Sequence, residues 1–122
     1  FSARDGHFAV IHALDGYDEI SLTGAFRIWK ETEDTVVQPG DWGLPVVAPE
    51  RLSGGETLEA SARILTDILK GEGSPEQTAA VLANAGLAIS VSRQVSFEEG
   101  IALAEESVKS GKAHGAFRKL VE

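Results

Sequence analysis

The chain has 122 residues, of which 43% are hydrophobic and 25% are charged, and this is the composition of one ordinary globular domain. Its formal net charge of −8 excludes the basic footprint that a nucleic-acid backbone requires, and no apolar run approaches the roughly 18 residues of a membrane span. The absence of cysteine excludes a disulfide framework, a thiol nucleophile and a cysteine-ligated metal site. These features fit a cytoplasmic location, with no nucleic-acid or membrane partner.

A polar lead-in over residues 1–6 precedes the first predicted strand, residues 8–14. This strand segment is a continuous apolar run with β-branched side chains, which is typical of a strand buried on both faces in an α/β protein. We expect His12 to be a hydrogen-bonded core residue rather than a base. The three histidines, His7, His12 and His114, show no metal-ligand spacing.

An acidic turn follows the strand. Asp15 and Gly16 form a turn pair, and with Asp18 and Glu19 the segment carries three carboxylates within five residues. Ligands of α/β proteins bind at the carboxyl ends of strands, and adjacent carboxylates repel each other unless a cation such as Mg²⁺ lies between them. Spacing alone also fits a solvated acidic turn, so both interpretations remain open at this point.

A β-hairpin is predicted next. Residues 26–31 and 35–38 are β-prone, and residues 32–34 form a short polar connection between them. Residues 39–55 hold three of the four prolines and predict a surface loop with an apolar anchor. We expect Trp42 in this loop to cover the core rather than stack on a ligand.

The rest of the sequence is predicted to be helical. Capping-box patterns place helix starts at Ser53, Ser74 and Ser96, with Thr57 as an alternative start for the first helix. The first helix is expected to end at Gly71, after a basic last turn.

The second helix is small and apolar nearly all round, which predicts burial on most sides. Asn84 and Gly86 are expected to interrupt it, because glycine costs up to about 1 kcal/mol against alanine unless another backbone packs closely. The last segment, residues 113–121, is expected to direct Phe117 and Leu120 inward. The buried face of the third helix is predicted to comprise Phe97, Ile101, Ala104 and Val108.

These elements predict a small α/β layer, but a strand buried on both faces needs sheet neighbours that this sequence does not supply. The chain also has no methionine and begins a few residues before that strand. We therefore expect a piece of a longer protein.

Few other residues offer reactive chemistry. Glycines lead into a helix N-terminus at residues 53–57, where backbone N–H groups can hold an anion, but the lysine of a P-loop is absent and a plain helix entry is expected. Ser21 lacks a nucleophile elbow and a histidine partner, so no catalytic residue is assigned. Only the acidic turn remains as a candidate site.

The acidic segment FAVIHALDGYDEISLTG resembles the metal-motif region of the anthranilate phosphoribosyltransferase family. The similarity covers essentially the whole chain in the same order, and DGYDEIS is its specific motif. Supporting matches lie at Gly43-Leu44, residues 52–57, 68–71, 81–85, 99–104 and 110–113.

The resemblance implies that residues 1–122 form the C-terminal part of a nucleoside phosphorylase/phosphoribosyltransferase-like α/β domain, with a buried strand, a hairpin and three to four helices. It implies that Asp18 and Glu19 hold Mg²⁺ on the pyrophosphate of phosphoribosyl pyrophosphate, from which the phosphoribosyl group passes to anthranilate in tryptophan biosynthesis. Asp15 and Gly16 would shape the turn and Ser21 would support it. The residues that bind the substrates are not assigned.

Several features of the family lie outside this sequence. The glycine-rich pyrophosphate loop, the Lys-His segment, the anthranilate-binding arginine and the helical domain through which the family usually dimerises are all absent here. We therefore expect the chain alone to be inactive and to need the missing N-terminal half, in a protein that is a homodimer when intact. The alternatives are a related phosphoribosyltransferase or phosphorylase with another substrate, and a non-catalytic binding or assembly module with the same fold.

Overall fold

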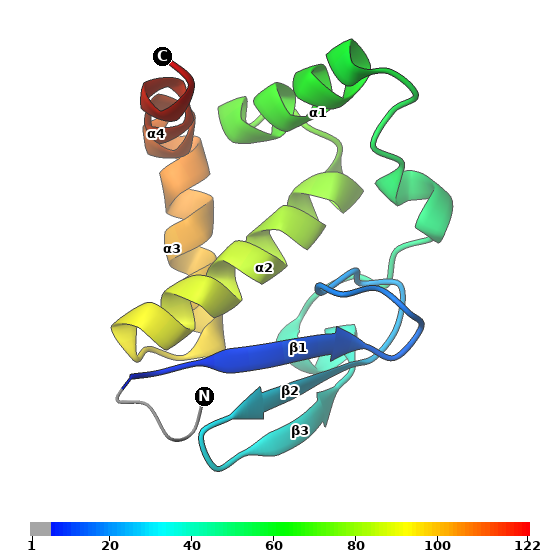
Figure 1. Cartoon of the computed structure of the whole chain (residues 1–122), viewed down its shortest axis with the longest axis vertical. Helices are drawn as coiled ribbons and strands as arrows, with labels where there is room; N and C mark the ends of the chain where they lie inside the picture. Colours follow the sequence, from blue (N-terminus) through cyan, green and yellow to red (C-terminus); the bar gives the residue numbers. More distant parts are fainter. Residues whose placement is uncertain (1–5) are drawn as a thin grey trace.

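The computed structural model describes residues 6–122, which form a sheet covered on one face by helices (Figure 1). The prediction for residues 1–6 therefore lies, apart from Gly6, outside the described residues. Within the described range, no helix is long and apolar enough to cross a lipid bilayer. In chain order the elements are β1 (Ala9–Ala13), β2 (Phe26–Lys30), β3 (Asp34–Val37), the 3-10 turns η1 (Pro39–Trp42) and η2 (Pro49–Leu52), α1 (Leu58–Lys70), α2 (Pro75–Arg93), α3 (Phe97–Lys109) and α4 (Lys112–Val121).

The predicted hairpin is confirmed. Strands β2 and β3 pair antiparallel, with Phe26 opposite Val37 and Trp29 opposite Asp34. Lys30 and Glu33 exchange backbone hydrogen bonds of 2.9 and 3.2 Å, so the tight connection lies one residue earlier than expected. Alternation along β2 buries Phe26 and Ile28 on the face that the helices cover.

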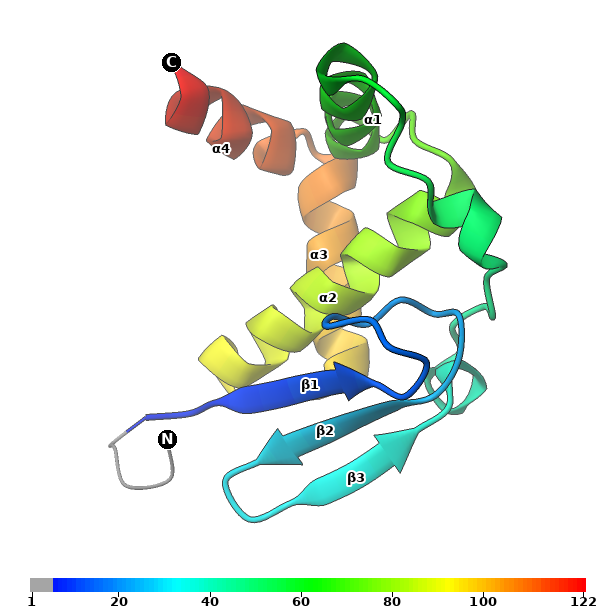
Figure 2. The ribbon, with the colours of Figure 1, turned by 45° about the vertical axis from the view of Figure 1, so that its right-hand side comes forward.

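Strand β1 is not buried on both faces, so that prediction is wrong. It pairs antiparallel with β2 at the edge of a sheet ordered β1-β2-β3. Ala13 is fully buried, whereas Val10 is 42% exposed and His12 is exposed. Figure 2 shows helices over only one face of the sheet in this part of the chain. Alternate residues of β1 therefore point to solvent, and His12, which is exposed, is not a core histidine.

Side-chain caps define the helix starts. Ser74 and Ser96 accept hydrogen bonds from the backbone N–H groups of the third helical residues, at 3.2 and 3.1 Å, as predicted. Helix α1 begins after Thr57, which caps it at 3.1 Å, and so the alternative start is the correct one and Ser53 is not the cap. Gly71 ends α1 in the left-handed conformation at φ +80°, as expected.

Helix α2 runs without a break through Asn84 and Gly86, so the expected interruption is wrong. The reason is the close packing that the glycine allows. A methyl group on Gly86 would lie 2.9 Å from the Cα atom of Ile101 in α3, and one on Gly100 would meet the carbonyl oxygen of Gly86. The backbones of α2 and α3 therefore touch where the two helices cross (Figure 1).

The core lies between the sheet and helices α2 and α3. Trp42 anchors the loop after β3, because its ring stacks on Phe97 at a centroid distance of 3.5 Å and meets Phe26 edge-on at 5.3 Å. The prediction that Trp42 covers the core is confirmed. Helix α4 lies away from the sheet, and Leu120 is 83% exposed, so its expected inward position is wrong. The buried core cluster comprises Ile20, Leu22, Phe26, Ile28, Val37, Val47, Ala83, Leu87 and Phe97.

Candidate functional site

The acidic turn leaves the carboxyl end of β1 and returns to β2 beside it. Its first half is a backbone turn in which the N–H of Gly16 donates to Ala13 O and the N–H of Ala13 donates to Tyr17 O, both at 3.1 Å. Gly16 has φ +105°, a conformation that residues with a Cβ atom rarely adopt. The sequence pair Asp15-Gly16 therefore forms a tight turn for a local steric reason.

Three side chains join the two ends of the turn. The hydroxyl of Thr23 donates to the Asp15 carboxylate, and the Ser21 and Thr23 hydroxyl oxygens lie 2.8 Å apart. Ser21 is only 4% exposed, so this hydrogen-bond chain reaches from the surface into the core. The geometry suits the supporting role expected for Asp15 and Ser21, although the sequence analysis did not identify Thr23, which connects them.

The carboxylates of Asp18 and Glu19 lie at the exposed part of the turn. Neither carboxylate has a hydrogen bond or ion pair to any residue from 6 to 122, whereas Asp15 is occupied by Thr23. The structure thus separates a structural carboxylate from two adjacent carboxylates that are free to take a ligand. The assignment of Asp18 and Glu19 as metal ligands stays a prediction.

The carboxylates of Asp18 and Glu19 fit Mg²⁺ if a phosphorylated ligand supplies the other oxygen atoms. In the described part of the chain, no group of three or more His, Cys, Asp or Glu side chains could enclose a metal ion. Magnesium differs from calcium in keeping several waters, and it is often held by one or two carboxylates together with the phosphates of a substrate. Two adjacent carboxylates on an open turn therefore suit a magnesium ion that arrives with a phosphorylated ligand.

The second half of the turn is anchored to α2. The side-chain amide of Asn84 accepts a hydrogen bond from the N–H of Ile20 at 3.0 Å and donates to Ile20 O at 2.7 Å. Leu22, with φ +64°, accepts a bond from the N–H of Val47 at 2.8 Å. The sequence signal for Asn84 was a polar side chain amid small apolar residues of a helix, because a buried amide needs partners.

A mostly apolar cleft of about 300 Å³ opens beside the turn. Tyr17 and Glu19 line it on the turn side, and residues of η2, the loop after it, α1 and α2 line the other sides. Residues 53–57, which lead into α1, border this cleft, and Gly55 packs so closely on the first turn of α1 that an added Cβ would lie 2.9 Å from the Ala60 Cβ. The prediction that this segment is a plain helix entry and not an anion site stays a prediction. The amide of Gln77 holds the same loop by donating to Ser53 O at 2.8 Å.

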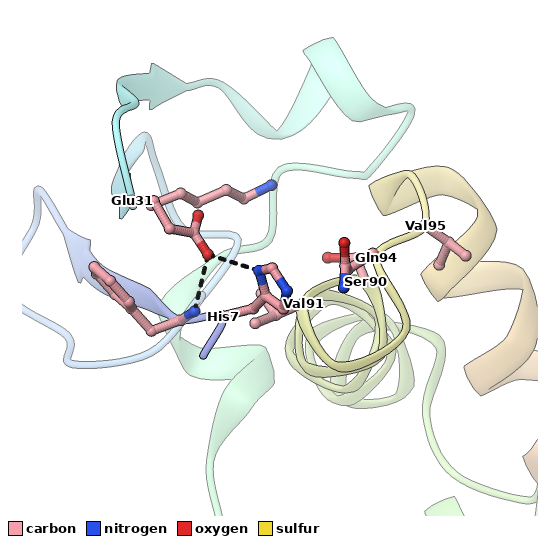
Figure 3. A pocket seen from close by; sticks show the side chains of 8 residues that line it. His7, Glu31, Ser90, Val91, Gln94 and Val95 are labelled. Carbon is pink, nitrogen blue, oxygen red and sulfur yellow. Dashed lines mark hydrogen bonds and ion pairs between the residues drawn. The ribbon is translucent and has the colours of Figure 1, made fainter. Parts of the chain in front are cut away.

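A second, polar pocket of about 160 Å³ lies at the other end of β1 (Figure 3). There the ring of His7 and the backbone N–H of Phe8 both approach one oxygen of Glu31, at 3.1 and 3.3 Å. The pKa of Glu31 lies below its usual value, first because its own backbone N–H hydrogen-bonds the carboxylate and then because of His7. Ser90 of α2 and Gln94, which follows the last residue of α2, border the pocket, at the opposite end of β1 from the acidic turn.

The fold and the anchored turn together define part of an α/β domain that presents two adjacent carboxylates with no partner among residues 6–122. The chain belongs to the glycosyl transferase family, a/b domain, whose family model matches residues 2–114. The anthranilate phosphoribosyltransferase of Christiangramia forsetii is 46% identical over 120 residues, which are 98% of this chain and 36% of that protein. The enzyme of Cytophaga hutchinsonii is 47% identical over 116 residues, which are 94% of this chain and 35% of that protein.

Solved structures agree. The crystal structure of anthranilate phosphoribosyltransferase from Thermus thermophilus matches with a TM-score of 0.81 at 30% identity, over 93% of this chain and 34% of that one. The Saccharomyces cerevisiae enzyme in complex with PRPP and Mg shares the fold, with a TM-score of 0.78 at 22% identity, over 92% of this chain and 32% of that one. The resemblance and the α/β class expected from the sequence are confirmed. The chain spans about a third of the length of these relatives.

Proposed function

We propose that this chain supplies the acidic magnesium-binding turn of an anthranilate phosphoribosyltransferase. One observation carries the proposal: in a chain 46% identical to such an enzyme, Asp18 and Glu19 are exposed, have no partner in the described residues 6–122, and lie on a turn that is anchored at both ends. The enzyme transfers the phosphoribosyl group from phosphoribosyl pyrophosphate to the amine of anthranilate and releases pyrophosphate.

The reaction needs a metal ion, residues that bind it and residues that support the metal-binding turn. When bound, Mg²⁺ neutralises the charge that develops on the departing pyrophosphate. Asp18 and Glu19 would hold the ion from the protein side, while the hydrogen bonds among Asp15, Thr23 and Ser21 support the turn that carries them. The step needs no covalent nucleophile from the protein, because the anthranilate amine itself forms the new C–N bond at the ribose carbon and loses a proton as the C–O bond to pyrophosphate breaks.

The complete active site requires further segments. Relatives are about three times as long as this chain. The family resemblance implies that the glycine-rich phosphate loop, the Lys-His segment and the anthranilate-binding arginine come from the part of the enzyme that lies upstream of this chain. Strand β1 supports this arrangement, since in residues 6–122 only β2 pairs with it. Beside it lies a cleft of about 280 Å³, lined on its apolar side by Ala9, Ile11, Leu87, Ala88 and Val91.

We propose that the missing N-terminal half of the enzyme adds a strand at this edge. We also propose that the intact protein is a cytoplasmic homodimer that assembles through its helical domain. Light scattering of the assembled enzyme tests the dimer, and cell fractionation tests the location. A monomeric assembled enzyme contradicts the first proposal, and recovery with the membrane fraction contradicts the second.

Loss of anthranilate fluorescence with phosphoribosyl pyrophosphate and Mg²⁺ tests the function in the assembled enzyme. The double variant Asp18→Asn, Glu19→Gln is expected to lower turnover by at least about 100-fold while leaving the fold intact. The matched control, Glu98→Gln with Glu99→Gln, removes another adjacent exposed pair at the start of α3 and is expected to keep wild-type turnover. Wild-type rates in the Asp18, Glu19 variant would contradict the proposal.

A further inference from the structure

Asn84 forms an unusual link between α2 and the acidic turn. Its amide bonds both backbone groups of Ile20, 64 positions earlier in the chain, at 3.0 and 2.7 Å. The same amide nitrogen also donates to Ala80 O at 2.9 Å, which fixes its orientation on the helix. One side chain therefore satisfies the N–H and the C=O of a single turn residue, as a neighbouring β-strand would.

Ile20 directly follows Glu19, so its backbone determines where the carboxylates project. The N–H of Ile20 lies in the peptide plane that begins at Glu19, and its side chain is fully buried in the core. Asn84 holds that peptide plane, and the hydrogen bond between Thr23 and Asp15 holds the other end of the turn. Asp18 and Glu19 lie between these two anchored positions.

The chemistry of the link suits a metal-binding turn. Adjacent carboxylates repel each other, and an arginine or lysine in place of Asn84 would pair with them and compete with a cation. A neutral amide holds the backbone and leaves both carboxylates without a partner in residues 6–122.

We propose that Asn84 is a positioning residue for the magnesium site: it sets the direction of Asp18 and Glu19 without touching the ion. This inference rests on the proposed function of the turn. Groups that orient metal ligands from behind commonly change metal affinity or activity by about 10- to 100-fold when they are removed.

The test compares Asn84→Leu with Gln77→Leu in the assembled enzyme. Both replacements remove an α2 amide that bonds the backbone of a loop, but Gln77 bonds Ser53 O and not the acidic turn. The Mg²⁺ concentration for half-maximal turnover is expected to rise about 10- to 100-fold in Asn84→Leu and to stay at the wild-type value in Gln77→Leu.

Two readouts do not depend on turnover. Hydrogen exchange at the Ile20 amide, measured without metal, is expected to accelerate about tenfold or more in Asn84→Leu, because its acceptor is gone. Broadening of the Ile20 amide signal by Mn²⁺ in the presence of phosphoribosyl pyrophosphate is expected in the wild type and to need more Mn²⁺ in the variant. If the leucine variant does not fold, the same measurements are made on Asn84→Ala, which removes the amide without filling the cleft.

The outcomes are separable. Faster exchange at Ile20 with an unchanged midpoint for Mg²⁺ and for Mn²⁺ would overturn the positioning role and leave a purely structural contact. Equal midpoint shifts in the Asn84 and Gln77 variants would overturn it as well. A wild-type enzyme without Mg²⁺-dependent turnover would instead contradict the proposed function, and the positioning role then stands or falls on the Mn²⁺ broadening.

Discussion

Replacing Gly86 with alanine is expected to destabilise the fold, although alanine is the better helix former. An added methyl group would lie 2.6 Å from Ile101 Cγ1 and 2.9 Å from the Cα and backbone N atoms of Ile101, whereas ordinary contact begins at 3.4 Å. A side-chain atom could move aside, but backbone atoms move only with their helix. Helix α3 must therefore shift by about 0.5 Å relative to α2, the difference between 3.4 and 2.9 Å.

The magnitude follows from two opposing effects. Alanine gains about 1 kcal/mol over glycine inside a helix, and overpacking against rigid atoms costs up to about 3 kcal/mol. The net loss is about 2 kcal/mol in the free energy of unfolding. For a chain of 122 residues, the typical unfolding entropy converts this loss into a fall of about 8 °C in Tm.

Thermal melts followed by far-UV circular dichroism measure the effect, and Gly115→Ala serves as the control. Gly115 also lies inside a helix, α4, but an added Cβ atom there meets nothing within 4 Å. The control should raise Tm by up to about 4 °C, since only the gain in helix propensity remains. A Gly86→Ala protein that melts at or above the wild-type temperature would refute the close contact between the two helices.

Three further predictions concern other contacts. Trp42→Ala removes the ring between Phe26 and Phe97 and is expected to cost about 3 kcal/mol in urea unfolding, with a smaller loss for Trp42→Phe; equal losses would contradict the packing role. Thr23→Val breaks the link to Asp15 and is expected to cost about 1 kcal/mol and to broaden the amide signals of the turn; an unchanged spectrum would contradict it. The pKa of Asp34 lies below its usual 3.8 because Arg27 hydrogen-bonds its carboxylate, so the stabilisation is present above pH 3.8 and is lost as the pH falls through the lowered pKa. In Asp34→Asn, the free energy of unfolding measured against pH should lack this loss at low pH. An acid unfolding transition identical to that of the wild type would show that the Arg27–Asp34 pair does not contribute to stability.

Local sequence rules predicted the elements that depend on neighbouring residues. Ser74 and Ser96 cap their helices because a hydroxyl three positions before an N–H group needs no distant partner. The hairpin followed from alternation and a polar connection, and Trp42 from the low exposure expected of a large ring. These features are determined within a few residues.

The wrong predictions share a dependence on distant contacts. The apolar run of β1 indicated burial on both faces, but pattern alone does not reveal how many layers cover a sheet, and Val10 is exposed. Gly86 was expected to interrupt α2 because glycine is a poor helix former, and it does not do so because it packs against Ile101 of another helix, a contact that the neighbouring sequence does not reveal. Within the candidate site, the carboxylates themselves were evident in the sequence. Asn84 was evident only as a polar residue in an apolar helix, and its bond to Ile20, 64 positions away, was not predicted.

The unpaired edge of β1 also bears on how the chain behaves in solution when it is produced by itself. The edge of a sheet presents a row of backbone N–H and C=O groups with which an extended segment of another chain can pair. Natural proteins usually cover such edges or protect them with charged side chains. Along β1 the side chains are Ala9, Val10, Ile11, His12 and Ala13, none of them acidic or a lysine. Isolated copies are therefore prone to associate through this strand, and a lysine at Val10, which is exposed, is a rational substitution for keeping them apart.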